Sequence, residues 1–439
     1  MQSGSVFSYL WLSMGMGALS LLTPCVFPMI PITVSYFANH ASKGRPDAIK
    51  KAALYGVGIM LTFVGLGMTL ALVFGAAGIN KLASNPWVNL LISAIFLGFA
   101  LSLLGVFFIQ VPWRLMNRLN RTSSSSKDSG VAGTLLMGFV FSLTSFTCTA
   151  PFVGTLLVLA SQGSWRWPLV GMLGFSFVFA IPFFVLALAP QLITQMPKAG
   201  GWMNSVKVVM GFLEIAAAMK FLSNADLIWH WNIFTRTTVL CIWTACMLMA
   251  AGYLLGWFHF DHDSEVVHLS GVRALCALLF ISISIWLLHG LGGAPLGEME
   301  AFLPPAEAAL SSRAVASTPA ESPWILNDLP KALETARSQG RPVFIDFTGY
   351  TCTNCRWMEA NIFSRPEITQ DMSGFVRVRL YTDGDGAIYE NQQDYENKHF
   401  GTVALPLYAL LDSQGNTIGT SAGITRDPAV FASFLAKAQ

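Results

Sequence analysis

The chain is 439 residues long and has the composition of a membrane protein, since 54% of its residues are hydrophobic and only 11% are charged. A soluble domain carries about 25% charged residues, so most of this chain must lie in lipid. The net charge of +2 and the lack of a long basic run argue against nucleic-acid binding. Seven cysteines are too few for a disulfide scaffold, so each cysteine is interpreted by its position.

Apolar stretches long enough to cross a bilayer recur along residues 1–293 and predict a polytopic α-helical membrane domain. Eight such spans are expected, at about 6–38, 52–78, 87–110, 131–160, 168–192, 207–223, 237–257 and 273–291. Lys and Arg gather in the loops after the first and third spans, at 43–51 and 114–127. Because positively charged loops stay in the cytoplasm, this pattern places both termini outside, in the periplasm of a Gram-negative cell.

The first and fourth spans each carry a Cys-x-x-Pro pattern, Cys25 to Pro28 and Cys148 to Pro151, with Pro24 before the first cysteine. The second pattern begins three spans after the first, and because three is an odd number this predicts an inverted 3+3 repeat followed by two further spans. Prolines break or kink a helix, and such backbone is tolerated in a membrane only where it faces protein or water. A single membrane cysteine is usually a small buried hydrophobe. The repeated pattern instead favours a redox role for this pair.

Other notable residues in the spans have weaker signals. Cys241, Cys246 and Cys276 lack the proline context and are interpreted as packing residues. Glu214 and Lys220 are charged residues in the sixth span, where a charge is a functional hypothesis by default. Lys220 is near the outer end of its span and is expected to extend to the interface. Glu214 is the better candidate, for proton handling or for helix pairing.

After residue 293 the composition changes to that of a linker, 294–323, and then of a soluble domain, 324–439. The predicted order of elements in this domain is α-β-α-β-α-β-β-α. The expected helices and strands are a helix at 329–339 ended by Gly340, strands at 342–348, 375–381 and 407–411, a helix at 387–400, a hairpin turn at 413–416 and a last helix capped by Asp427.

The pair Cys352 and Cys355 comes directly after the first of these strands and opens a helix. A C-x-x-C in that place is typical of a redox dithiol. The positive end of the helix favours the thiolate of Cys352, which is therefore the expected nucleophile, with Cys355 resolving the mixed disulfide. The alternative, half of a zinc site, needs a second pair of ligands, and His399 is the only nearby histidine in this domain.

With these residues, 324–439 resembles a thioredoxin-fold domain. The resemblance implies that Asp346 is the buried acid that accepts the resolving thiol's proton. It also implies that Pro406, after Leu405, is a cis-proline facing the dithiol. The chain departs from the common Trp-Cys-Gly-Pro-Cys version, because Thr353 and Asn354 stand between the cysteines. The redox potential of the pair therefore does not follow from the resemblance.

The first six spans, with their two Cys-x-x-Pro patterns, resemble the membrane domain of the DsbD/CcdA family of thiol-disulfide interchange proteins. The resemblance implies a cofactor-free relay in a bacterial inner membrane. Cytosolic thioredoxin would reduce Cys25 and Cys148, which would reduce the outer dithiol and then periplasmic disulfide proteins. An immunoglobulin-like domain usually precedes the membrane part in DsbD-like proteins and does not precede it here, so we expect that it has been removed or that a separate protein is the last acceptor.

Two other interpretations stay open. One is a transporter of copper or of a small thiol with a tethered thioredoxin-like domain, for which the 18 scattered Met residues give weak support. The other is a dedicated cytochrome c maturation factor, which shares the chemistry and differs in its partner.

Overall fold

The computed structural model of this chain describes residues 6–21, 45–106, 135, 138–139, 141–142, 145, 149, 166–188, 200–260, 270–305 and 324–438. The chain divides into two compact units. Unit 1 comprises Met1–Ile79, Ile95–Ile215 and Gly252–Ala277, and unit 2 comprises Asn80–Ala94, Ala216–Ala251 and Leu278–Gln439. Each unit is described by itself below.

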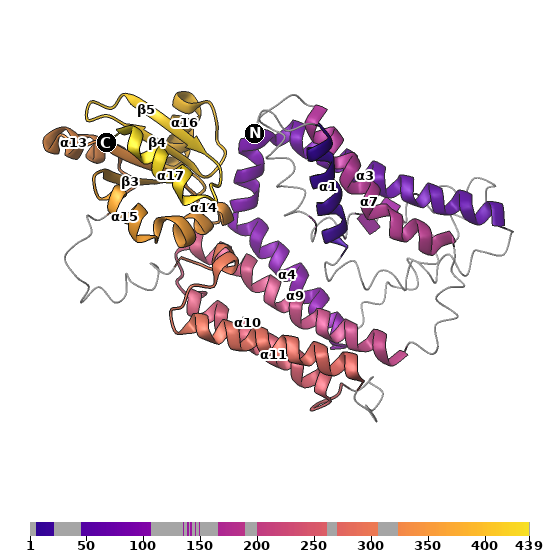
Figure 1. The fold of residues 1–439 in the computed structure, drawn as a ribbon. Coiled ribbons are helices and arrows are strands. Elements are labelled where there is room, and N and C mark those ends of the chain that lie inside the picture. The colour runs from indigo at the N-terminus through magenta and orange to yellow at the C-terminus, as the bar shows by residue number, and fades with distance from the viewer. Residues whose placement is uncertain are drawn as a thin grey trace. The chain divides into compact units, whose positions relative to one another are not determined.

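The described part of the first 293 residues is almost entirely helical (Figure 1). The long helices are α1 (Val6–Ser20), α3 (Arg45–Ser84), α4 (Pro86–Leu103), α7 (Arg166–Leu188), α9 (Gly200–Trp229), α10 (Arg236–Leu255) and α11 (Gly271–Leu291). By length and composition, four segments within the described residues qualify to cross a membrane: Ala52–Thr69, Pro86–Leu103, Arg236–Leu255 and Gly271–Leu291. The predicted helical membrane region is therefore confirmed, whereas the count of eight spans and the inverted repeat stay predictions.

In unit 1, α1 and α7 approach each other closely through small residues. A Cβ atom at Gly17 of α1 would lie 2.6 Å from the carbonyl oxygen of Phe175 in α7. Membrane helices that meet at glycine can bring their backbones into contact, which supplies much of their packing energy. Beside this contact, buried aromatic rings fill the core, with Phe63 edge-on to Phe179 at a centroid distance of 5.2 Å.

The C-terminal domain is built on one mixed sheet. Its strands are β1 (Ile325–Leu326), β2 (Val343–Thr348), β3 (Val376–Tyr381), β4 (Leu407–Leu411) and β5 (Thr417–Ala422), in the order β1-β3-β2-β4-β5. Strands β1, β3 and β2 run parallel to one another. Strand β4 is antiparallel to β2, and β5 is antiparallel to β4. The predicted strands are confirmed to within a residue at their ends. The two-residue β1 is too short to leave a pattern in the sequence and was not predicted.

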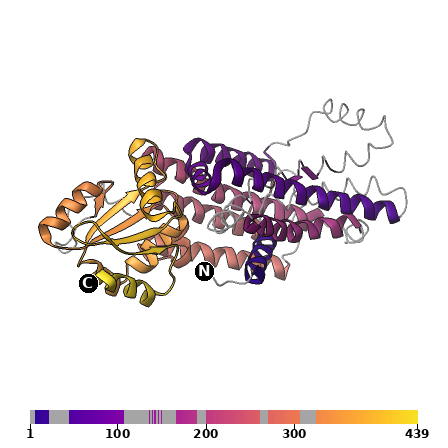
Figure 2. The same cartoon turned by 90° about the horizontal axis from the view of Figure 1, so that it is seen from above.

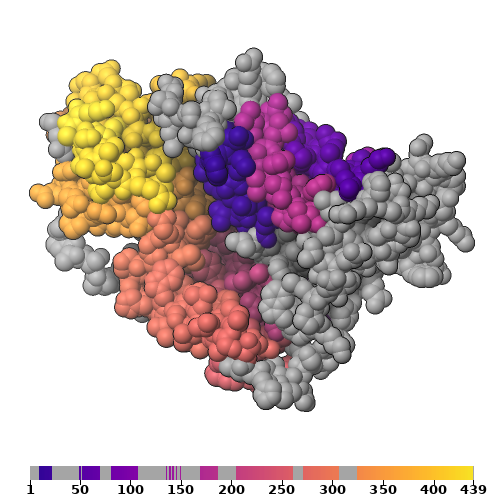
Figure 3. All heavy atoms as spheres, turned by 45° about the vertical axis from the view of Figure 1, so that its right-hand side comes forward, coloured from indigo at the N-terminus to yellow at the C-terminus, as the bar shows by residue number. Residues whose placement is uncertain are grey.

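Helices cover both faces of this sheet. The core on one face includes residues of α13 (Leu329–Gln339) and α16 (Ala387–Phe400), and the core on the other includes α14 (Thr353–Met358), α15 (Pro366–Met372) and α17 (Pro428–Leu435). Figure 2 shows α16 and α17 on opposite sides of the strands, and Figure 3 shows the yellow C-terminal residues closely packed. The predicted ends hold: Gly340 ends α13 at a φ of 62°, and the Asp427 side chain accepts the Ala429 N–H at 2.9 Å.

Part of the predicted linker is ordered. Residues Gly297–Phe302 form a 3-10 helix, η1, in which Ala301 belongs to the same buried cluster as Trp357 and Met358. Glu300 of η1 forms an ion pair with Arg236 of α10 at 2.7 Å. Composition suggested a segment without a core of its own, and η1 indeed uses the core of the following domain. Residues 306–323 lie outside the described part of the chain.

Candidate redox site

The loop after β2 delivers the two cysteines to the start of a helix. Cys352 is the N-cap residue of α14, and its sulfur accepts the backbone N–H of Cys355 at 3.1 Å. The two cysteines form a disulfide with a Cα–Cα distance of 5.3 Å. The predicted pair is therefore joined, at the predicted junction of strand and helix.

The two sulfurs differ in access. Cys352 is half-buried, whereas Cys355 is only 1% exposed. A thiolate that attacks the disulfide needs access to the sulfur it attacks. The difference therefore favours Cys352 as the sulfur that forms mixed disulfides.

Asp383, just after β3, holds the loop before the cysteines. Its carboxylate accepts the N–H groups of Tyr350 and Thr351 at 2.7 and 3.0 Å and the Thr351 hydroxyl at 2.9 Å. Burial raises the pKa of Asp383, although these hydrogen bonds oppose the rise. A Cβ atom on Gly349 would lie 2.6 Å from a carboxylate oxygen of Asp383, so the close approach needs glycine. Sequence reasoning missed Asp383. Its place as a polar residue just after a buried strand could have suggested a role.

Tyr350 forms an aromatic lip beside the cysteine loop. Its ring stacks on Tyr381 at 4.0 Å, and its hydroxyl lies 3.3 Å from the hydroxyl of Tyr389 in α16. Burial is the main reason why the pKa of Tyr350 is raised, so the phenol stays neutral. The lip therefore adds no charge next to the dithiol.

The predicted buried acid, Asp346, is 1% exposed in the middle of β2. Alternation along the strand puts it on the same face as Phe344, which belongs to the core shared with α14. The parallel register places Arg379 of β3 opposite it, and the Arg379 Nε donates to its carboxylate at 3.0 Å. Burial raises the pKa of Asp346 to about 6 in spite of this arginine.

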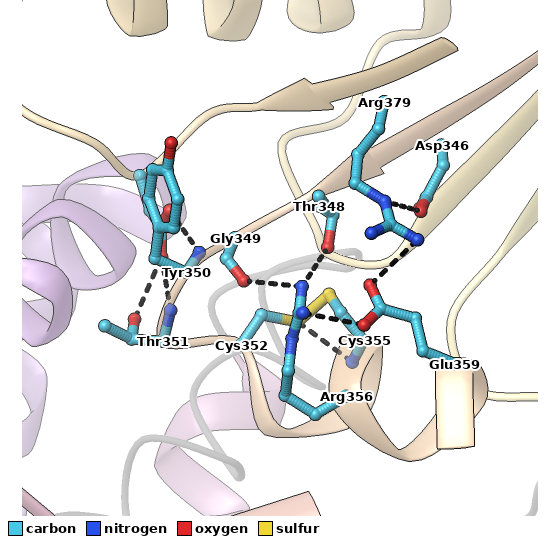
Figure 4. Close-up of a disulfide and its surroundings, with 11 residues drawn as sticks. Asp346, Thr348, Gly349, Tyr350, Thr351, Cys352, Cys355, Arg356, Glu359 and Arg379 are labelled. Carbon is cyan, nitrogen blue, oxygen red and sulfur yellow. Dashed lines mark hydrogen bonds and ion pairs between the residues drawn. A yellow bond between two sulfur atoms is a disulfide. The ribbon is translucent and has the colours of Figure 1, made fainter. Parts of the chain in front are cut away.

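Asp346 belongs to a buried cluster of four charged residues (Figure 4). Arg379 also lies 3.5 Å from Glu359, which in turn pairs with Arg356 at 2.6 Å. Both arginine side chains are 4% exposed, and that of Glu359 is 16% exposed. Sequence reasoning missed these three partners of Asp346. The signal for Arg379 was a charged residue inside an apolar strand; Arg356 and Glu359 gave none.

The peptide bond before Pro406 is cis, as the resemblance implied. Pro406 is buried, and its carbonyl oxygen accepts the Gly423 N–H at 2.8 Å. Its expected role opposite the dithiol stays a prediction.

Only some of the candidate residues in the predicted membrane spans lie within the described part of the chain. Cys25, Cys148, Pro24, Pro28 and Pro151 lie outside the described residues, so their roles stay predictions. Glu214 is buried in α9. The cysteines interpreted as packing residues lie on α10 and α11: Cys241 is exposed, Cys246 buried and Cys276 half-buried.

Unit 2 also places ends of long helices against the domain that carries the dithiol. The ring of His230, directly after α9, meets the Tyr350 ring edge-on at a centroid distance of 5.5 Å. Lys81, near the end of α3, pairs with Glu390 of α16 at 2.5 Å. That ion pair is largely exposed and adds little stability. The two contacts nevertheless mark Tyr350 and the start of α16 as the part of the domain that faces the helix ends.

Comparison with known proteins covers both parts of the chain. Residues 6–225 match the family model described as cytochrome C biogenesis protein transmembrane domain, and residues 324–413 match the one described as thioredoxin-like. The chain is 28% identical to the thiol:disulfide interchange protein DsbD of Vibrio cholerae, over 93% of this chain and 63% of that protein. It is 27% identical to DsbD of Vibrio vulnificus, over 94% and 64%, and 27% identical to DsbD 2 of Pseudomonas aeruginosa, over 88% and 63%. The chain thus spans a little under two thirds of the length of these relatives.

Proposed function

Because this chain belongs to the family of the cytochrome C biogenesis protein transmembrane domain and is DsbD-like along nearly its whole length, we propose that it is a protein-disulfide reductase of the bacterial inner membrane. It would pass reducing equivalents from cytosolic thioredoxin to disulfides of periplasmic proteins. Proteins of cytochrome c maturation are one class of acceptor. The dithiols alone would carry the electrons, so no cofactor is required.

In the proposed sequence, cytosolic thioredoxin first reduces a disulfide between Cys25 and Cys148. A thiolate of that pair then attacks the Cys352 sulfur, the Cys352–Cys355 bond breaks, and Cys355 leaves as the thiolate. The second membrane thiol cleaves the mixed disulfide, so two electrons and two protons reach the outer pair. Cys352 repeats the same exchange on a periplasmic disulfide, and Cys355 resolves it.

The proposed orientation has both termini in the periplasm. Its support is the positive charge of the loops at 43–51 and 114–127. It agrees with the contact between His230 and Tyr350, because the dithiol domain and the end of α9 then lie on the same side of the membrane. Glycosylation or thiol-labelling of engineered loop sites would test it.

One observation carries the proposal: a half-buried Cys352 bonded to a buried Cys355, in a thioredoxin-like domain joined to an apolar helical region of this family. An isolated thioredoxin-like domain would act on partners from its own compartment. Joined to that membrane region, the domain has a route to cytosolic reducing power.

The test is the redox state of Cys352 and Cys355 in cells, measured by thiol alkylation with cytosolic thioredoxin present and depleted. We expect the pair to be reduced normally and to become oxidised on depletion or in Cys25→Ser and Cys148→Ser variants. Cys241→Ser is the matched control and should leave the pair reduced. A pair that stays reduced on thioredoxin depletion, in Cys25→Ser and in Cys148→Ser would contradict the relay.

A further inference from the structure

Arg356 stands directly after Cys355, and its side chain is 4% exposed. Arginine is almost never fully buried unless it is paired. The proposed relay gives this side chain no task. Among the described residues, however, its side-chain hydrogen bonds and its ion pair lie at the cysteine turn and at Glu359, three residues further along the helix.

The first set of contacts holds the turn. The Arg356 Nη2 donates to the Thr348 hydroxyl at 3.2 Å and lies 3.4 Å from the Gly349 carbonyl oxygen. The same carbonyl accepts the backbone N–H of Cys352 at 3.3 Å, and the Arg356 N–H donates to the Cys352 carbonyl at 3.1 Å. The Arg356 side chain is therefore bonded to Thr348 at the end of β2 and to the Gly349 carbonyl that also accepts the Cys352 N–H (Figure 4).

The second contact balances charge. The Arg356 Nη1 pairs with Glu359, and Arg379 is shared between Glu359 and Asp346. The cluster thus holds two cations and two carboxylates. Without Arg356 the carboxylates would outnumber the cations, one helical turn from Cys355. Among the described residues, other titratable groups near the cluster include Tyr381 of β3, Asp383, Tyr408 of β4 and Lys220 of α9.

We propose that Arg356 is a positioning residue for the dithiol, which ties the cysteine turn to the end of β2 and offsets the charge of Glu359, and so sets how readily the disulfide is reduced. The inference rests on the proposed function only for its meaning in the cell. The chemistry concerns the pair alone. Reduction breaks the sulfur–sulfur bond with two electrons and two protons taken from an added dithiol, and a nearby cation favours the thiolate form of the product.

The experiment uses the full chain in detergent, equilibrated with mixtures of reduced and oxidised dithiothreitol. Differential alkylation and mass spectrometry then report Cys352 and Cys355 separately from the other cysteines. In Arg356→Gln we expect the pH midpoint of Cys352 alkylation to rise by about one pH unit. At a pH above both midpoints, where Cys352 is a thiolate in either chain, we also expect the equilibrium to move about tenfold toward the disulfide. Glu359→Gln should shift both readouts the opposite way, and the double variant should return close to the parent chain.

Two further variants keep the test sharp. Arg365→Gln removes an exposed arginine that pairs with Glu367 and should change neither readout. Arg356→Lys keeps the charge but loses the planar set of donors, so the pH midpoint should hold while the turn becomes more open to alkylation. If Arg356→Gln does not fold, the two midpoints measured in Glu359→Gln still test the inference. Unchanged midpoints in folded Arg356→Gln, or in Glu359→Gln, would overturn the inference.

These outcomes are independent of the relay. A shifted midpoint in vitro together with a pair that ignores Cys25→Ser in cells would leave the role of Arg356 standing and remove the proposed function. Unshifted midpoints together with a pair that depends on Cys25 would do the reverse.

Discussion

Glu396 of α16 is a buried acid that the redox chemistry does not use. It is 0% exposed, and neither carboxyl oxygen has a hydrogen-bond partner among the described residues. Burial raises its pKa from 4.5 to about 9. The folded state therefore holds a proton that the unfolded chain releases above pH 4.5. The resulting stabilisation is complete below pH 4.5 and is lost as the pH rises towards 9.

We expect Glu396→Gln to remove this pH dependence, because an amide keeps the shape and does not ionise. At pH 7 the free energy of unfolding of the domain should rise by as much as about 3 kcal/mol. This change would be measured by thermal unfolding of the full chain between pH 5 and 9, with the protease resistance of the domain as the readout. Glu334→Gln, on the exposed side of α13, is the control. Equal slopes for parent and Glu396→Gln would contradict the argument.

Asp383 gives a second prediction at this scale. Asp383→Ala removes the acceptor for the amides of Tyr350 and Thr351, so the loop before Cys352 should lose order. Leaving a buried donor unsatisfied costs about 1–3 kcal/mol. Hydrogen exchange at these two amides should accelerate by about five- to 150-fold, since 1.4 kcal/mol is one decade. Asp385→Ala, two residues on and exposed, should leave exchange unchanged.

At the scale of secondary-structure elements, the close contact of α1 with α7 is sensitive to a single substitution. Gly17→Val would put its Cβ atom 2.6 Å from the Phe175 carbonyl oxygen, and a backbone atom cannot give way as a flexible side chain can. The two helices must then separate, at a cost of about 1–3 kcal/mol. We expect a lower melting temperature in detergent. Gly15→Val, where a Cβ atom meets nothing within 4 Å, is the matched control and should melt like the parent chain.

The same scale shows what sequence could and could not predict. The strands and the helix ends of the C-terminal domain were predictable because each rests on a local pattern, such as the apolar run of β2, Gly340 or Asp427. The cluster of Arg356, Glu359 and Arg379 was not, since strand register and helix packing join positions that are far apart in sequence. η1 was missed for a similar reason, because its buried face is completed by residues more than fifty positions later.

For the molecule as a whole, the unequal access of the two sulfurs predicts the order of exchange. Cys355→Ser should accumulate a mixed disulfide between Cys352 and a partner, because no second thiol resolves it. Cys352→Ser should accumulate none, since Cys355 is 1% exposed. Non-reducing gels of acid-trapped cells would show the difference. Trapping through Cys355 instead would mean that the attacked sulfur has been misassigned.

The placement of η1 also bears on what happens if the chain is cut. Asn361 donates to the Gly297 carbonyl at 3.4 Å, Arg426 pairs with Glu298 at 3.0 Å, and Ala301 lies in the domain core. The partners of η1, which are Asn361, Arg426 and the core residues around Ala301, come later in the chain than residues 306–323. A protease that cleaves at Arg313 would therefore produce two fragments that stay associated. The covalent connection would be lost, yet the C-terminal fragment would co-purify with the helices until a denaturant separated them.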